Sequence, residues 1–246
     1  APEAAALLAK LLLSPNVPRA EHSRLVRALD FHDIKPKEAA LTALLEGDAK
    51  RNPATYLEAF QRATPKFLEK HPEVLKRVES AMLASKGTVT FVDMVSLFHR
   101  KDMVKHLMDM VQSTPENEPG VRAAGQIFAF KEGHRIAAAL NKPNQAPAFL
   151  KALGFVGNNQ AVAMLRAVTT DEARFESSRL LAITALGRSS SGAGVLMQLV
   201  QQKKLAGEFL APAIRSLASS PGPNTRSFAA QHQKLLAPVG KRWPIE

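Results

Sequence analysis

The sequence predicts an all-α protein whose antiparallel helix hairpins stack into a solenoid, an α-α superhelix. Three observations predict this fold. The apolar residues are mostly Ala and Leu, which favour helices. Pro, Gly and Asn separate apolar stretches of helical length at short intervals. Short motifs recur at intervals of 31–33 residues. The one candidate strand, residues 88–92, is too short to found a sheet.

The positions of helix-breaking residues predict sixteen helices. The first nine are expected over residues 3–13, 20–29, 36–46, 53–63, 65–70, 72–84, 90–99, 102–112 and 120–130. The other seven are expected over 133–140, 146–153, 159–168, 171–187, 192–203, 206–218 and 225–236. Several begin with Pro in the first turn, where its missing N–H costs little. Others follow capping residues, such as Asn158 or Thr170-Asp171, and residues 189–192 are expected to form a turn and a helix N-cap.

Repetition favours a solenoid over a closed bundle. Ala152-Leu153-Gly154 recurs 33 residues later as Ala185-Leu186-Gly187, with a weaker third copy at residues 216–218. Such helix hairpins cannot bury their apolar faces alone and must stack on their neighbours. We therefore divide the chain into irregular N-terminal repeats (1–112), a linker-like loop (113–120), regular repeats (121–237) and a tail (238–246) that holds the only Trp, Trp243.

Composition excludes several classes of chemistry. The chain has no Cys, so disulfides, thiolate metal sites, Cys nucleophiles and covalently attached haem are excluded within it. The apolar runs near the start are far shorter than the roughly 20 residues of a membrane span. The sequence begins Ala1-Pro2-Glu3, as a processed or truncated chain would. The net charge of +11 and pI of about 10.1 favour acidic partners, but the basic residues are spread out, so a lysine-rich soluble surface is the simpler explanation.

The second half resembles HEAT-type repeats, most clearly over residues 178–188, SRLLAITALGR. Residues 27–32, 37–45 and 196–218 also resemble the helical region of large exported planctomycete-type proteins, which are membrane-bound dehydrogenases with a β-propeller and a c-type cytochrome domain. The resemblance implies a periplasmic or otherwise extracytoplasmic location, with a cytoplasmic one as the alternative. The haem motif C-x-x-C-H is absent, so none of that family's electron-transfer chemistry is assigned to a residue here.

A basic surface is the one candidate binding site. In a solenoid, equivalent helices line one face, and a stripe of Lys and Arg on that face can bind the phosphates of a nucleic acid. Four glutamates lie between these Lys and Arg residues in the sequence, which gives a surface of mixed charge. The nearby aromatic residues have the spacing of core residues. The predicted surface comprises Arg62, Lys66, Lys70, Lys76, Arg77, Arg100, Lys101 and Lys105.

No catalytic, cofactor or metal site is predicted. His99 and His106 lie near acidic residues, but their spacing matches no known ligand motif. His32 is expected to cap a helix end. The acidic residues at helix ends are expected to cap helices or to lie in turns; they are Asp30, Asp33, Glu46 and Asp48.

The resulting functional hypothesis is a non-enzymatic scaffold or protein-interaction domain, part of a larger exported redox protein. Its partner is expected to be an acidic protein or an adjoining domain. The alternative is a nucleic-acid-binding HEAT-like protein with a basic groove, such as a DNA-repair glycosylase.

Overall fold

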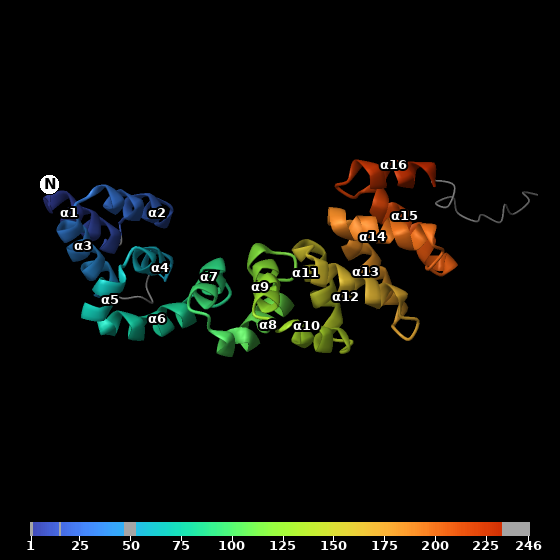
Figure 1. Ribbon diagram of the computed structural model, residues 1–246, viewed down its shortest axis with the longest axis horizontal. Helices are drawn as coiled ribbons and strands as arrows, with labels where there is room; N and C mark the ends of the chain where they lie inside the picture. Colours follow the sequence, from blue (N-terminus) through green and yellow to red (C-terminus); the bar gives the residue numbers. More distant parts are fainter. Residues whose placement is uncertain (1, 15, 47–52, 233–246) are drawn as a thin grey trace, which may run out of the picture. The chain divides into compact units, whose positions relative to one another are not determined.

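A computed structural model describes residues 2–14, 16–46 and 53–232 (Figure 1). These residues form sixteen α-helices and two short 3₁₀ helices, with no strand among them. The prediction of an all-α protein is therefore confirmed. Residues 88–92 are not a strand: Thr88 precedes helix α7, and its side chain accepts a hydrogen bond from the Phe91 N–H.

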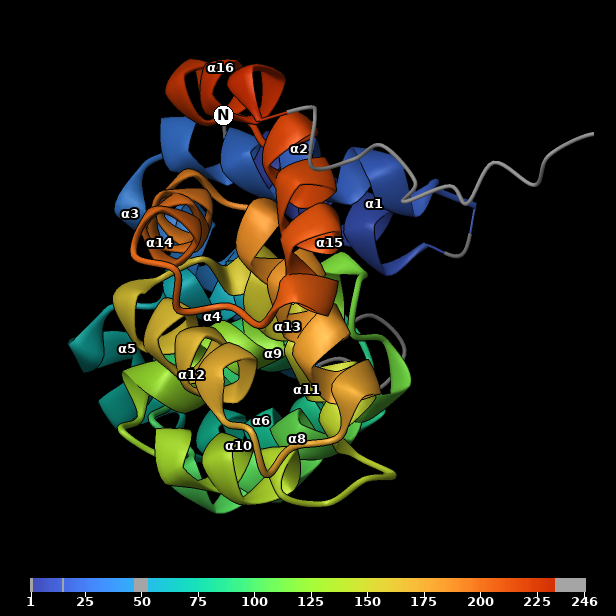
Figure 2. The ribbon, with the colours of Figure 1, turned by 90° about the vertical axis from the view of Figure 1, so that its right-hand side faces the viewer.

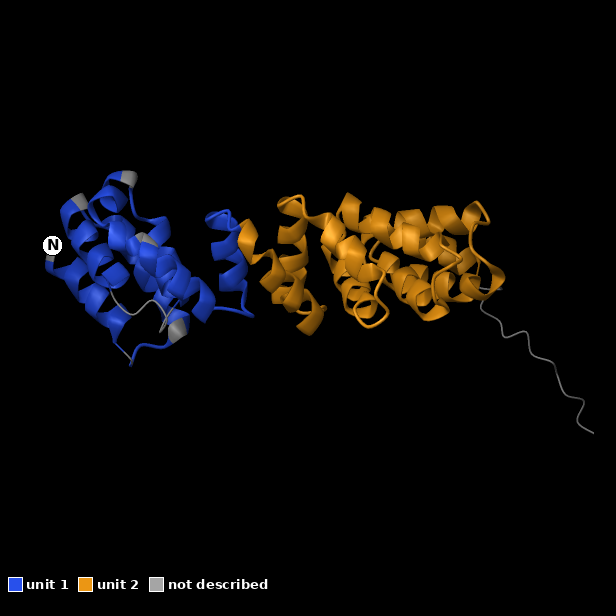
Figure 3. Cartoon of the chain, turned by 90° about the horizontal axis from the view of Figure 1, so that it is seen from below, with its two compact units in different colours: residues 1–100 blue, residues 101–246 orange. Residues whose placement is uncertain are grey.

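The chain divides into two compact units, residues 1–100 and 101–246, which we describe separately (Figure 3). The first unit contains α1 (Pro2–Leu13), α2 (Arg19–Ala28), η1 (Leu29–Phe31), α3 (Ile34–Glu46), α4 (Pro53–Gln61), α5 (Pro65–Lys70), α6 (Pro72–Ala84) and α7 (Val89–Leu97). The second contains η2 (Lys101–Met103), α8 (Val104–Ser113), α9 (Glu118–Ala129), α10 (Gly133–Leu140), α11 (Ala146–Val156), α12 (Asn159–Thr170), α13 (Glu176–Gly187), α14 (Ser190–Gln201), α15 (Gly207–Ala218) and α16 (Pro223–Gln231).

The predicted loop 113–120 lies within the second unit, and it is shorter than expected: Ser113 ends α8 and Glu118 begins α9, so residues 114–117 join the two helices. Its Glu116 carboxylate is 3.2 Å from Lys151 Nζ on α11 and 2.8 Å from an Arg188 guanidinium nitrogen after α13. The loop is thus tied to later helices of the same unit. The predicted tail, with Trp243, lies outside the described residues.

Side-chain caps mark several helix starts. The Asn158 side-chain oxygen accepts from the Ala161 N–H at 2.8 Å, and the Ser189 hydroxyl accepts from the Gly192 N–H at 3.1 Å. The Asn158 cap agrees with the sequence prediction, whereas α14 begins at Ser190, two residues before its predicted start. Each cap satisfies an amide that has no partner inside its helix. Thr64 and Thr88 cap α5 and α7 in the same way.

The predicted helix over 171–187 begins five residues later than expected. Asp171 caps no helix start: α12 continues to Thr170, and α13 begins at Glu176. The Asp171 carboxylate accepts from the Ala173 N–H at 3.1 Å and from Arg174 Nε at 3.1 Å. Arg174 also donates to the Leu140 carbonyl, so these contacts hold residues 171–175 in a turn.

Two series of helices pack in the second unit. In one series, α9 contacts α11, α11 contacts α13, and α13 contacts α15. In the other, α12 contacts α14, and α14 contacts α16 (Figures 1 and 2). Their shared interior holds buried aromatic and aliphatic side chains, including Phe149, Leu150, Ile183 and Phe209. The first unit follows a related order, in which α1 packs on α3 and α2 packs on α4.

The repeated Ala-Leu-Gly motif marks the close approach of neighbouring helices. A Cβ added at Gly154 would lie 2.9 Å from Ala185 Cα, and one at Gly187 would lie 2.9 Å from Ser216 Cβ and O. The glycine of each copy therefore packs on the first residue of the next copy. In the third copy the equivalent residue is Ala218, which is exposed.

Candidate interaction surface

The eight residues of the predicted basic surface are divided between the two units. Arg62, Lys66, Lys70, Lys76, Arg77 and Arg100 belong to the first unit, whereas Lys101 and Lys105 belong to the second. The arginines and the lysines of this set also differ in their environments, so we describe them in turn.

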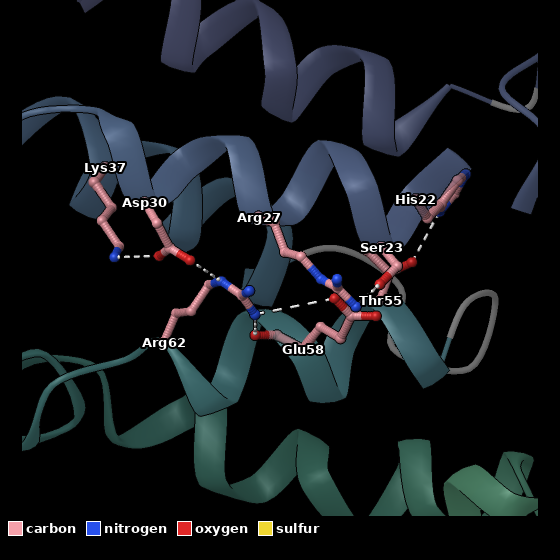
Figure 4. A network of polar contacts seen from close by, with 8 residues as sticks. All are labelled: His22, Ser23, Arg27, Asp30, Lys37, Thr55, Glu58 and Arg62. Atoms are coloured by element: carbon pink, nitrogen blue, oxygen red, sulfur yellow. Dashed lines mark hydrogen bonds and ion pairs between the residues drawn. The ribbon is translucent and has the colours of Figure 1, made fainter. Parts of the chain in front are cut away.

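Arg62 is engaged in a network inside the first unit (Figure 4). Its Nε lies 3.1 Å from Asp30 Oδ2, and its NH1 donates to the Glu58 carbonyl at 2.9 Å. Lys37 Nζ reaches the other Asp30 oxygen at 2.7 Å. The Lys37 hydrogen bond and the nearby Arg62 charge lower the pKa of Asp30, despite some opposing desolvation. Arg62, which follows α4 directly, therefore connects the end of α4 to η1, and its side chain is only 17% exposed.

Arg77 and Arg100 also make local contacts. The Arg77 guanidinium donates to the Leu45 carbonyl at 2.9 Å, which joins α6 to α3. Arg100 NH2 lies 3.5 Å from a Glu79 carboxylate oxygen. These arginines are partly buried and help to hold helices together.

The lysines are the exposed members of the set. Lys66 and Lys70 lie four residues apart on α5, and Lys76 lies on α6. No ion pair to these three lysines occurs among the described residues. Lys101 and Lys105 are likewise exposed, near the start of the second unit.

A buried histidine–threonine pair joins α2 to α4 (Figure 4). His22 Nδ1 lies 2.8 Å from Thr55 Oγ1, and His22 Nε2 lies 3.2 Å from the Val17 carbonyl oxygen. A carbonyl only accepts, so in neutral His22 the proton resides on Nε2, and Nδ1 accepts from the Thr55 hydroxyl. Both side chains border a hollow of about 470 Å³.

A second hollow, of about 490 Å³, follows the outer side of α2. We call it the Phe31 hollow; it is lined by Ala20, Ser23, Arg24, Arg27, Ala28 and Phe31. Phe31 is 91% exposed, the most exposed large apolar residue among those described. The Arg27 guanidinium donates to Ser23 Oγ at 3.2 Å, and Arg24 lies 2.9 Å from a Glu21 oxygen. An exposed ring thus stands beside two guanidinium groups.

The histidines considered as metal ligands are not brought together within either unit. His99 ends α7 in the first unit with a φ of 49°, whereas His106 lies in the second unit, 3.9 Å from Asp109 Oδ2. Asp30 is held by Lys37 and Arg62, and Asp48 lies outside the described residues. A different group, Glu46, His71 and Glu73, has the closeness that a metal ion requires.

None of the described helices is both long enough and apolar enough to cross a membrane. In comparisons with known proteins, no family model, no curated protein and no solved structure matches the chain. The HEAT-like resemblance and the narrower dehydrogenase resemblance therefore remain predictions.

Proposed function

We propose that the chain is a HEAT-like α-solenoid that acts as a non-enzymatic scaffold for a protein partner or an adjoining domain. The supporting observation is a recurring spacing of 32–35 residues between side chains and the groups they contact. Stacked helix hairpins of this length produce such a spacing, because each hairpin meets the next at equivalent positions. These contacts are His22–Thr55, Arg62–Asp30, Arg77–Leu45, Lys151–Glu116, Arg174–Asn141 and Ser191–Gly157.

The Phe31 hollow is the surface that best fits a protein partner. Aromatic residues and arginines are enriched where proteins bind one another, and a few of them supply most of the affinity. An exposed Phe31 ring also leaves apolar area in water, which a partner would cover. Arg24 and Arg27 favour an acidic partner segment. We therefore propose an acidic segment that carries a large apolar side chain as the bound element.

A peptide selection tests this surface. A library of displayed random linear peptides is selected on the immobilised chain, and the affinity of the enriched peptides is measured. We expect Asp or Glu beside a large apolar residue, and an affinity loss of roughly tenfold or more for Phe31→Ala and for Arg27→Glu. Phe175→Ala is the matched control, because Phe175 is also exposed, at 66%, but lies in the second unit.

Two results would contradict the scaffold proposal. One is a selection whose binders are insensitive to both substitutions in the Phe31 hollow. The other is an intrinsic catalytic activity that a single substitution abolishes without unfolding the chain.

Nucleic-acid binding is the second candidate, and the exposed lysines of α5 and α6 favour it. Each lysine that contacts a phosphate contributes to the salt dependence of binding. Charge reversal at Lys66, Lys70 and Lys76 should then weaken binding to duplex DNA and reduce its salt slope. Arg77 is left unchanged because it holds the Leu45 carbonyl. Unchanged binding and an unchanged slope would eliminate this candidate.

The resemblance to exported dehydrogenases supports an extracytoplasmic location and a redox domain as the neighbour. The reading frame around this sequence tests that part of the proposal. A secretion signal upstream, with a propeller or a C-x-x-C-H motif in the same frame, would support it. A frame that lacks all three would favour the cytoplasmic alternative.

A further inference from the structure

Three side chains with metal-binding groups converge in the first unit. Glu46 is the last residue of α3, His71 separates α5 from α6, and Glu73 lies in the first turn of α6. One ligand atom from each lies within 4.8 Å of the other two. The group therefore joins two segments that are 25 residues apart in the sequence.

The separation of His71 and Glu73 is close to that of two ligands on one small ion. His71 Nδ1 lies 3.2 Å from Glu73 Oε1. Two ligands bound tetrahedrally to one Zn²⁺, with bonds of roughly 2.0–2.2 Å, are separated by roughly 3.3–3.6 Å. The His71 ring is also held in place, because it stacks on Phe67 at a centroid distance of 4.4 Å and an interplanar angle of 27°.

The local electrostatics favour a cation near the carboxylates. Glu46 stands at the C-terminal end of α3, where the helix dipole disfavours negative charge. Arg77 is the opposing feature. Its positive charge lies near Glu73, while its guanidinium binds the Leu45 carbonyl.

We propose that Glu46, His71 and Glu73 bind a divalent transition-metal ion, with Zn²⁺ preferred and water completing its coordination. One imidazole and two carboxylates match the donor preferences of Zn²⁺, whereas Ca²⁺ and Mg²⁺ prefer oxygen ligands alone. The bound ion would fasten the end of α3 to the start of α6. Because only three protein ligands are present, the affinity should be lower than that of a four-ligand structural zinc site. This inference does not depend on the proposed scaffold function.

Titration of the metal-free chain with ZnCl₂ tests the proposal. Calorimetry should show one ion per chain, and the thermal unfolding midpoint should rise, because an ion that binds the folded state stabilises it. Co²⁺ should give visible absorption bands from bound metal. MgCl₂ at the same concentration should leave the midpoint unchanged.

Ligand substitutions locate the ion. His71→Ala and the isosteric Glu73→Gln should each lower the Zn²⁺ affinity at least roughly tenfold. His134→Ala is the matched control, because His134 lies 3.5 Å from Glu132 in the second unit but belongs to no three-residue group among the described residues. Circular dichroism shows whether each variant remains folded. Absence of a single stoichiometric site, or equal affinity in the parent chain and both ligand variants, would overturn the proposal.

Discussion

Both units join neighbouring helices through polar side chains, and the second unit adds close approach of helix backbones at two glycines. In the first unit, polar side chains cross between helices: His22 meets Thr55, Arg77 meets the Leu45 carbonyl, and the Tyr56 hydroxyl donates to the Val74 carbonyl at 2.6 Å. In the second unit, Gly154 and Gly187 let helix backbones come close. The comparison teaches that residues separated by a similar distance in the sequence can be joined by specific polar contacts or by close packing of helix backbones. Only backbone proximity leaves a repeated motif in the sequence.

The units also differ in charge. Residues 1–100 contain 15 Lys and Arg against 12 Asp and Glu, whereas residues 101–246 contain 18 against 10. Most of the net positive charge therefore lies in the second unit, while the Phe31 hollow lies in the first. We infer that long-range attraction of an acidic partner and local contact with it depend on different parts of the chain.

The largest expected effect tests backbone proximity in the second unit. Replacing both Gly154 and Gly187 by Ala should lower the free energy of unfolding by about 2–6 kcal/mol, since overpacking costs about 1–3 kcal/mol at each site. The added Cβ atoms would meet neighbouring backbone atoms, which cannot rotate away. Chemical denaturation measures the change.

Two other glycines of the same unit provide the control. A Cβ at Gly125 or Gly194 would meet nothing within 4 Å. Both lie inside helices, so Gly→Ala there should raise the free energy of unfolding by about 0.5–1 kcal/mol. Losses of similar size at all four positions would contradict a special role for Gly154 and Gly187.

The next effect tests the polar contacts of the first unit through Tyr56. Burial raises the pKa of Tyr56 to about 12 from its ordinary value of 10.0. The folded chain therefore favours the neutral phenol. The resulting contribution to the free energy of unfolding is complete below pH 10 and is lost as the pH rises to 12. The loss is about 2–3 kcal/mol, at about 1.4 kcal/mol per pKa unit.

Denaturation at a series of pH values measures this loss, and Tyr56→Phe should remove that part of the pH dependence. Tyr56 is the only tyrosine, so the absorbance of its phenolate can be followed directly. Tyrosinate formation at the ordinary pKa, or identical pH profiles for the parent chain and Tyr56→Phe, would contradict the burial of the Tyr56 hydroxyl.

Helix caps should matter equally in the two units. Thr88→Ala in the first unit and Ser189→Ala in the second each remove a hydroxyl that accepts a helix N–H. Each should cost about 1 kcal/mol of unfolding free energy. Ser190→Ala is a nearby control, because Ser190 is exposed and follows the cap. A much larger loss in one unit would show that its caps also support packing between helices.

The smallest expected changes in unfolding free energy are at three residues that follow helix ends and have a positive φ although they are not glycine. His99, Lys131 and Lys203 have φ values of 49°, 63° and 55°, in the left-handed region that favours Gly. Lys131→Gly and Lys203→Gly should each raise the free energy of unfolding by about 0.5–1 kcal/mol, and His99→Gly should do the same in the first unit. Lys204→Gly, at a position without a positive φ, should give no gain. An equal gain in unfolding free energy for Lys204→Gly and Lys203→Gly would contradict backbone strain at Lys203.

Much of the fold could be predicted because Pro and Gly bracket the helices. Residues 65–70, 72–84 and 133–140 form helices with the predicted limits. The turn over 171–175 was missed because contacts with the distant residues Leu140 and Asn141 support it, and periodicity within a helix cannot show them.

The candidate sites were less predictable, since they depend on tertiary contacts. Arg62 was expected on a binding surface, but Asp30, 32 residues earlier, pairs with it. The exposure of Phe31 follows from the path of the chain after α2, and the sequence around it gives no sign that the ring is uncovered. Glu46 lies 25 residues before His71, so no ligand motif links them, and helix packing brings them together.

Distances between spin labels in the second unit test the solenoid proposal most directly. The chain has no Cys, so labels can be attached to cysteines introduced at the exposed positions Gln160 (α12), Ser190 (α14) and Asn224 (α16). In a solenoid, the distance from α12 to α16 should exceed that from α12 to α14 by about one helix spacing, roughly 8–10 Å. Equal distances, or a shorter distance from α12 to α16, would indicate a closed bundle and contradict the account.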